Sequence, residues 1–190
     1  MQRKTLRQRI LNLVLAAMFM AIGIVLPFFT GQIPQIGSML LPMHLPVLLC
    51  GLICGWQYGG LVGFLLPLVR SLWLGMPPIL TAFAMAFELA AYGIIVGVLY
   101  HHSKWKRVVS LYRSLIAAMI GGRIIWGVAT VIITGVSGNS FTLGMFISGA
   151  LLNAIPGIIL QMVFVPAVMV ALDKAKLVRF SKPQQVTAKG

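Results

Sequence analysis

The sequence contains few charged residues, and acidic residues are almost absent. Only 9% of the 190 residues are charged, whereas about a quarter are charged in a soluble domain. Two acids, Glu88 and Asp173, stand against fifteen lysines and arginines, and the formal net charge is +13. On a soluble protein this charge would favour nucleic acid as the partner. Because the basic residues here collect at the ends of long apolar segments, we expect a protein that lies in a lipid bilayer and binds no nucleic acid.

The sequence also lacks the motifs of several enzyme classes. It has no G-x-x-x-x-G-K-[ST] phosphate loop, which argues against ATP hydrolysis by this chain. It has no H-E-x-x-H motif, and with one acid inside the apolar segments a metalloenzyme or an aspartyl protease is hard to build. The two cysteines, Cys50 and Cys54, lie in one apolar segment and are expected to pack rather than form a disulfide. We therefore expect no enzyme activity, no metal and no cofactor in this chain.

The long uncharged runs predict an all-α membrane protein with six transmembrane helices. A spanning helix needs roughly 20 mainly apolar residues. The expected helices are Ile10–Phe29, Ser38–Trp56, Tyr58–Leu74, Ile79–Tyr100, Leu111–Gly135 and Gly144–Leu172. We expect residues 1–190 to form one integral membrane domain, in which basic tails at residues 1–9 and 173–190 flank a bundle over residues 10–172.

The charge distribution decides whether residues 38–74 form one helix or two. One helix of that length would run about 55 Å at 1.5 Å per residue, against a hydrocarbon core of about 30 Å. With two helices, the basic N-terminal tail, the basic segment at residues 104–113 and the tail from Lys174 all lie on one side. The positive-inside rule places that side in the cytoplasm. We therefore expect both termini inside, with outer loops around residues 30–37, 75–78 and 136–143.

Glycines and prolines recur at positions with structural meaning. Small residues follow one another at every fourth position, which allows close packing between helices of the chain; they are Gly51, Gly55, Gly59 and Gly63. Four prolines fall inside predicted helices, where each removes a backbone hydrogen bond and is expected to kink its helix. These are Pro46, Pro67, Pro156 and Pro166.

Three charged side chains fall inside the predicted helices: Arg70, Glu88 and Arg123. Charge at membrane depth is costly and usually faces a cavity or a partner. Counted from the outer loops, these residues and Asn153 lie in the outer half of the bilayer or near its midplane. Because four helices bring polar groups to a similar depth, we expect one substrate site that opens outward.

Arg70 and Glu88 have two possible roles, as an ion pair across the short GMPP link or as substrate-binding residues. A pair between them leaves Arg123 without an acid inside the membrane, so its guanidinium is expected to bind the carboxylate or phosphate of a ligand. His44 is either a further donor in the site or bonded to a carbonyl that Pro46 frees. Further candidates are Trp73, as a wall of the site or an anchor at the membrane interface, Tyr92 and Trp126 as walls, and Gln32 in an outer loop.

Two stretches carry a family resemblance. One is QIPQIGSMLLPMHLPVLLCGLICGWQYGGLVGFLLPLVRSLWLGMPP, with AMAFELAAYG after it, and the other is LAAMFMA, where Ala17 and Ala21 form an Ala-x-x-x-Ala pattern. Together they resemble the S components, the substrate-binding subunits, of energy-coupling factor (ECF) vitamin transporters of Gram-positive bacteria. The resemblance covers the whole chain.

The resemblance implies a mechanism and a set of partners. An S component in the bacterial plasma membrane binds a vitamin from outside, under a lid that here would include residues 32–37 and 138–142. It then docks through the Ala17 and Ala21 face on a transmembrane coupling subunit, the T component, and topples in the membrane. Two cytoplasmic ATPase subunits use ATP to drive release, so this chain would carry no nucleotide itself.

The substrate follows from charge and from a closer resemblance. Two arginines against one glutamate would make the cavity net positive, which favours an anionic vitamin over cationic thiamine. GSMLLPMHLPVLLCG most resembles the pantothenate group, so we expect Arg123 to bind the pantothenate carboxylate, and Arg70, Asn153 and His44 to bind its hydroxyl and amide groups. The alternatives are an S component for biotin, folate or a pyridoxine- or hydroxymethylpyrimidine-type vitamin, and a stand-alone proton-coupled carrier that uses Arg70 and Glu88.

Overall fold

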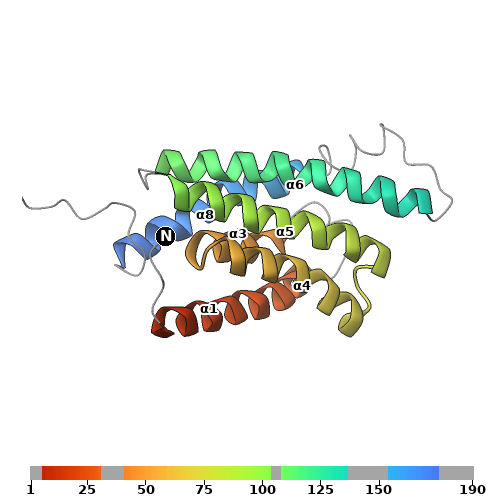
Figure 1. Cartoon of the computed structure of the whole chain (residues 1–190), viewed down its shortest axis with the longest axis horizontal. Coiled ribbons are helices and arrows are strands. Elements are labelled where there is room, and N and C mark those ends of the chain that lie inside the picture. The colour runs from red at the N-terminus through yellow and green to blue at the C-terminus, as the bar shows by residue number, and fades with distance from the viewer. Residues whose placement is uncertain (1–5, 31–40, 104–107, 137–153, 176–190) are drawn as a thin grey trace, which may run out of the picture.

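The structure is a computed structural model, and it describes residues 6–30, 41–103, 108–136 and 154–175 (Figure 1). In these residues it contains six α-helices and one short 3₁₀ helix. The elements are α1 (Leu6–Val25), η1 (Leu26–Thr30), α3 (His44–Ile53), α4 (Trp56–Leu74), α5 (Ile79–His102), α6 (Val108–Val136) and α8 (Ile155–Lys174). The predicted all-α class is confirmed.

Four helices are long and apolar enough to cross a membrane: α1 together with η1, α5, α6 and α8. The helix α4 is long enough but contains Gln57, Arg70 and several glycines, which lower its mean hydropathy. The ten residues of α3 rise only about 15 Å. Six spans, and the side on which the termini lie, therefore stay predictions.

The predicted break between two helices in residues 38–74 is confirmed, but it falls at a different residue. The helix α3 ends at Ile53, and α4 begins at Trp56. Gly55 between them has a φ of 105°, a conformation that side chains with a Cβ rarely adopt. Trp56, predicted as the last residue of the second helix, is therefore the first residue of α4.

The prolines divide into two pairs. Pro67 and Pro166 lie inside α4 and α8, as predicted. Pro46 and Pro156 lie instead in the first turns of α3 and α8. In a first turn the backbone N–H has no intrahelical acceptor, so a proline there removes no helical hydrogen bond. The prediction that these two prolines kink their helices was wrong.

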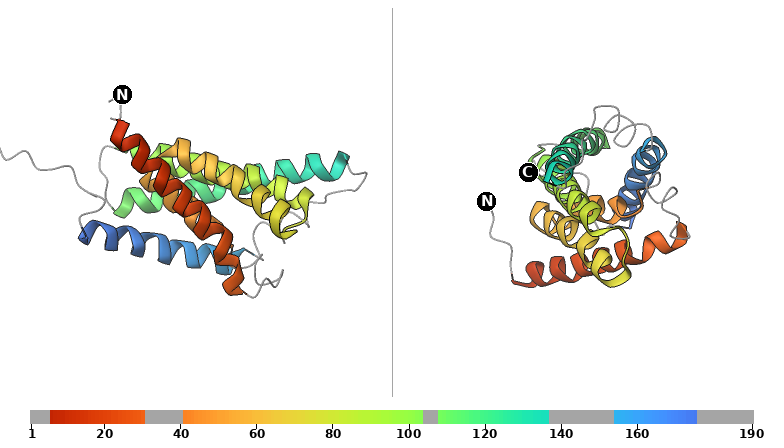
Figure 2. Two further views of the ribbon diagram at one scale, coloured as in Figure 1. Left: turned by 90° about the horizontal axis from the view of Figure 1, so that it is seen from below. Right: turned by 90° about the vertical axis from the view of Figure 1, so that its right-hand side faces the viewer.

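The helices α3, α4 and α5 pack against one another (Figure 2), and glycines lie at their contacts. A Cβ on Gly93 would meet the backbone of Gly59, and a Cβ on Gly63 would meet the backbone of Leu89. A Cβ on Gly51 would meet the carbonyl oxygen of Gly93. Close packing within the chain by the fourth-position glycines is therefore confirmed, and it fixes α5 against α3 and α4.

Two apolar clusters form the interior. One packs α3, α5, α6 and α8 together; among its residues are Leu48, Leu52, Tyr92, Val96, Leu111, Leu115, Met119, Val165 and Met169. The other packs α1 against α3, α4 and α5; among its residues are Ala16, Val47, Cys50, Cys54, Leu66 and Leu89. Both cysteines are free and buried. Large apolar side chains are also exposed along every α-helix except α3, as expected for surfaces that face lipid.

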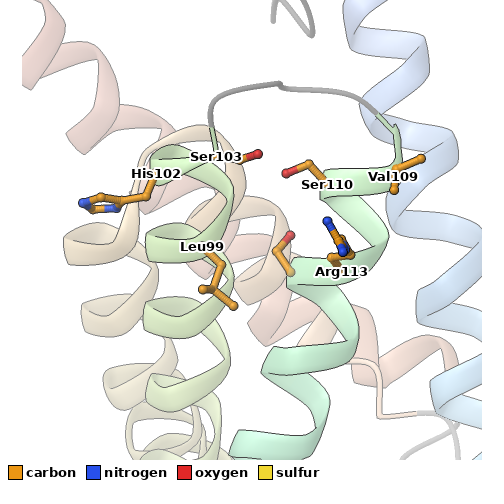
Figure 3. A pocket seen from close by; sticks show the side chains of 7 residues that line it. Leu99, His102, Ser103, Val109, Ser110 and Arg113 are labelled. Carbon is orange, nitrogen blue, oxygen red and sulfur yellow. The ribbon is translucent and has the colours of Figure 1, made fainter.

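The helices run in two opposite directions along the bundle. The helices α3, α5 and α8 run in one direction along the bundle, and α4 and α6 run in the other (Figure 1). The start of α1, the end of α5, the start of α6 and the end of α8 lie at the same end. At this end, a hollow of about 680 Å³ lies between α5 and α6 (Figure 3).

Candidate functional site

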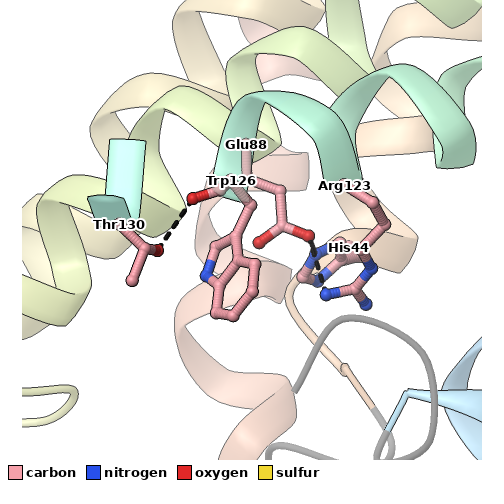
Figure 4. A network of polar contacts seen from close by, with 5 residues as sticks. All are labelled: His44, Glu88, Arg123, Trp126 and Thr130. Atoms are coloured by element: carbon pink, nitrogen blue, oxygen red, sulfur yellow. Dashed lines mark hydrogen bonds and ion pairs between the residues drawn. The ribbon is translucent and has the colours of Figure 1, made fainter. Parts of the chain in front are cut away.

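Three buried ionisable side chains meet between α3, α5 and α6. Glu88 Oε1 lies 3.0 Å from Arg123 Nη1 and 3.4 Å from His44 Nε2 (Figure 4). The exposed fractions are 2% for Glu88, 8% for Arg123 and 0% for His44. Among the described residues, no group of three or more His, Cys, Asp or Glu side chains is placed to hold a metal ion. The arrangement is an ion pair with an imidazole beside it.

Tyr92 completes this group. Its ring meets the His44 ring edge-on, with centroids 4.9 Å apart. The same ring packs on Gly122, where a Cβ would clash with it. Tyr92 lies one turn after Glu88 on α5 and interacts electrostatically with both Glu88 and Arg123. We call His44, Glu88, Tyr92 and Arg123 the polar cluster.

The polar cluster has hydrogen-bonding capacity that the described part of the chain does not fill. Arg123 Nε and Nη2, together with His44 Nδ1, have no hydrogen-bond partner there. Buried polar groups in proteins nearly always have partners, and leaving one unsatisfied costs about 1–3 kcal/mol. Nε and Nη2 form one edge of the guanidinium, the edge that holds a carboxylate through two parallel bonds. Arg123 therefore has donor capacity that its ion pair with Glu88 leaves unused.

Gln161 on α8 is a further buried polar residue, and the sequence analysis did not identify it. It is fully buried, and neither its amide nitrogen nor its amide oxygen has a partner among the described residues. It lies one turn before Val165, a residue of the apolar cluster that α8 shares with α3, α5 and α6. A polar residue with apolar neighbours inside a helix is the sequence signal that points to it.

Arg70 does not pair with Glu88. Its Nη1 donates a hydrogen bond of 2.6 Å to the carbonyl oxygen of Ile24, and its guanidinium lies 5.3 Å from the centre of the Phe28 ring. Glu88 pairs with Arg123 instead, so the expectation that Arg123 lacks an acidic partner was also wrong. The sequence order favoured the pair across the GMPP link, but α6 packs on α5 at the depth of Glu88.

Arg70 joins the end of α1 to α4. The helix α1 ends at Val25 and continues as the 3₁₀ helix η1, so the accepting carbonyl of Ile24 lies where the α-helical hydrogen-bond pattern gives way to the tighter one. Carbonyls at the end of a helix lose their regular intrahelical donors, and side chains can donate to them instead.

Trp126 and Trp73, both predicted as walls of the site, lie in different parts of the structure. Trp126 lies one turn beyond Arg123, and Figure 4 shows both side chains on the same side of α6. Trp73 is 75% exposed and lies near the end of α4, away from the polar cluster. Its exposure fits an anchor at the membrane interface better than a wall of the site.

Other predicted residues fall outside the site or outside the described chain. Gln32, Asn153 and the loops at residues 32–37 and 138–142 lie outside the described residues. Ala17 and Ala21 are both exposed on α1, whereas Ala16 and Gly23 on the opposite side are buried. The Ala-x-x-x-Ala pattern therefore lies on a surface that the described helices leave exposed.

Comparison with known proteins gives one match. The family model described as "ECF transporter, substrate-specific component" matches residues 11–170. No curated protein and no solved structure matches the chain. The matched range includes all the α-helices nearly in full, together with the polar cluster and Gln161. The chain belongs to the family of substrate-specific components of ECF transporters.

Proposed function

We propose that this chain binds a small vitamin at the polar cluster and delivers it to the coupling and ATPase subunits of an ECF importer, with pantothenate as the first candidate. The observation that carries this proposal is a set of buried polar atoms without hydrogen-bond partners among the described residues. His44, Arg123 and Gln161, from three helices, together hold six such nitrogen or oxygen atoms. Tyr92 of the polar cluster and the apolar cluster of α3, α5, α6 and α8 share the interior around them.

The chemistry of pantothenate matches the donors and acceptors of this site. Its carboxylate suits the Nε–Nη2 edge of Arg123, because Glu88 occupies only Nη1. Its amide and hydroxyl groups need donors and acceptors together, and the Gln161 amide and the His44 ring supply both kinds. The biotin and folate carboxylates would use the same edge of Arg123.

A neutral vitamin of the pyridoxine or hydroxymethylpyrimidine type is the second candidate. The observation in its favour is charge balance, since Glu88 neutralises Arg123 and Arg70 lies elsewhere. The polar cluster is therefore close to neutral, and the net positive cavity expected from the sequence is not formed. A proton-coupled carrier built on an Arg70–Glu88 pair is not proposed, because that pair does not exist in the structure.

The proposed partners, membrane and topology follow from membership of the family. The exposed face of α1 around Ala17 and Ala21 would contact the T component, and ATP would be used only by the two ATPase subunits. The chain would lie in a bacterial plasma membrane as one six-helix domain, with both termini in the cytoplasm. Arg7 and Arg9 near the start of α1, Arg113 near the start of α6 and Lys174 at the end of α8 are at one end of the bundle, and they support this orientation.

Calorimetric titration of the detergent-purified chain tests the proposal. Pantothenate, biotin, folate, pyridoxine and thiamine are titrated into the wild type, into Arg123→Ala and into Arg113→Ala, an exposed arginine of the same helix. We expect tight binding of pantothenate, at least a tenfold loss in Arg123→Ala, since a bond to a charged group contributes about 1.5–3 kcal/mol, and no loss in Arg113→Ala. Tight binding of a vitamin that Arg123→Ala leaves unchanged would contradict the assigned role of Arg123.

A further inference from the structure

The hollow between α5 and α6 is separate from the polar cluster. Its lining is made by the last residues of α5 and the first residues of α6: Leu99, His102, Ser103, Val109, Ser110, Arg113 and Ser114. Arg113 and Arg123 are ten residues apart on α6, which is about 15 Å along the helix. The proposed vitamin site therefore does not account for this hollow.

The polar side of the hollow consists of hydroxyls and a guanidinium. Ser103 and Ser110 point toward each other from the two helix ends (Figure 3), and Arg113 lies one turn beyond Ser110. His102 points away from α6, and its Nδ1 lies 2.9 Å from the carbonyl oxygen of Val98. No carboxylate is among the described lining residues. Hydroxyls and a guanidinium without an acid form a donor set that suits a phosphate group.

Two apolar side chains, Leu99 on α5 and Val109 on α6, also line the hollow (Figure 3). Leu99 is 44% exposed and Val109 is 65% exposed. In a membrane, apolar side chains beside a phosphate-binding group would contact the glycerol and acyl region of a lipid. A free phosphate ion would leave these apolar walls uncovered.

The surrounding sequence adds positive charge. Residues 101–113 contain no acid and four lysines or arginines, which are Lys104, Lys106, Arg107 and Arg113. The positive-inside rule assigns this end of the bundle to the cytoplasmic leaflet, which contains the anionic lipids. Basic pockets between transmembrane helices on this side are known to bind lipid headgroups.

We propose that the α5–α6 hollow binds the phosphate headgroup of an anionic phospholipid. Arg113, Ser103 and Ser110 hold the phosphate, and Leu99 and Val109 contact the lipid beyond it. The bound lipid bridges the end of α5 and the start of α6. It therefore stabilises the folded chain by RT ln(1 + L/Kd), where L is the concentration of free lipid.

Native mass spectrometry of the full chain tests this site. Phosphatidylglycerol or phosphatidylcholine is added to the chain in neutral detergent, and retained lipid is counted for the wild type, Arg113→Gln, Ser110→Ala and Lys174→Gln. Lys174 is an exposed basic residue at the same end of the bundle, on α8. We expect tighter retention of phosphatidylglycerol, an affinity loss of about tenfold in Arg113→Gln and a smaller loss in Ser110→Ala, because a charged hydrogen bond contributes more than a neutral one. Lys174→Gln should bind as the wild type does.

Three results would overturn the proposal. Equal affinity of the wild type and Arg113→Gln for phosphatidylglycerol would exclude this hollow as the lipid site. If inorganic phosphate, added without lipid, stabilised the wild type as strongly as phosphatidylglycerol does, the ligand of the hollow would be a free anion and not a lipid. If Arg113→Gln kept its lipid but lost assembly with the ATPase and coupling subunits, the hollow would contact a protein partner.

Discussion

Arg70 and Arg123 are both buried arginines inside helices, yet they bind different kinds of groups. Arg70 donates to a backbone carbonyl at the end of α1, and Arg123 faces a carboxylate and keeps one edge without a partner among the described residues. Sequence reasoning could identify both as buried, because charge within an apolar helix stands out. It could not assign their partners, because the partner of Arg70 is a backbone atom and the partner of Arg123 depends on how α6 packs on α5.

Arg70→Gln should reduce stability without a direct effect on the polar cluster. The substitution removes the charged donor to Ile24, and we expect it to lower the free energy of unfolding by about 1–3 kcal/mol. Thermal unfolding in detergent measures this change, with Arg9→Gln as the control because Arg9 is exposed on α1. An unfolding midpoint of Arg70→Gln equal to that of the control would show that the contact with Ile24 contributes nothing.

Glu88→Gln should change which vitamins bind. The amide keeps the shape of Glu88 but removes the negative charge beside Arg123, so an anionic vitamin should bind several-fold more tightly and a neutral one should not. Calorimetric titration measures both affinities, and Asp173→Asn, the same change at the other acid, is the control. Weaker binding of pantothenate in Glu88→Gln would indicate that Glu88 itself contacts the ligand.

Gln161→Leu should separate binding from stability. Leucine fills a similar volume without buried polar atoms, so the ligand-free chain should be as stable as the wild type or more stable. Vitamin affinity should fall about tenfold if the amide holds the ligand. The control is Gln57→Leu on the exposed side of α4. Unchanged affinity in Gln161→Leu would remove Gln161 from the site.

At the scale of helices, glycine contacts set the position of Glu88. Gly93 and Gly63 let α5 approach α4 closely, and Gly51 brings α3 against α5. The fourth-position spacing predicted close packing but not the partner helix, since Gly93 lies outside that series. Helix positions followed from long apolar runs, whereas the exact start of α4 depended on the backbone of Gly55.

Gly93→Ala should loosen this contact. The added Cβ would meet the backbone of Gly59, which cannot move aside as a flexible side chain could, and we expect a loss of about 1–3 kcal/mol in stability. Gly135→Ala is the matched control, because its Cβ meets nothing within 4 Å and alanine favours the helix. Thermal unfolding of the two variants gives the comparison, and equal midpoints would mean that α4 and α5 separate at little cost.

At the scale of the whole molecule, α1 has one face on the bundle and one face open. Ala16 and Gly23 are buried, while Ala17 and Ala21 are exposed among large apolar residues. Family membership implies coupling and ATPase subunits, and this open face is where the resemblance places the T component. The proposed substrate site on α3, α5, α6 and α8 would leave this face of α1 for assembly.

Replacing both Ala17 and Ala21 by leucine should block delivery without blocking binding. The larger side chains would prevent close helix contact with the T component. We expect vitamin affinity within about twofold of the wild type, since the polar cluster is not altered, and loss of ATP-dependent uptake in vesicles with the coupling and ATPase subunits. Ala167→Leu, at an exposed alanine of α8, is the control. Normal uptake by the double variant would place the coupling surface elsewhere.

The central claim is that Arg123 binds the substrate and Arg70 joins α1 to α4. Calorimetric titration of one vitamin into Arg123→Gln and Arg70→Gln tests it most directly. We predict a loss of about 10- to 150-fold in affinity for Arg123→Gln, equivalent to about 1.5–3 kcal/mol, and a change within about twofold for Arg70→Gln. A large loss in Arg70→Gln with unchanged affinity in Arg123→Gln would contradict the account.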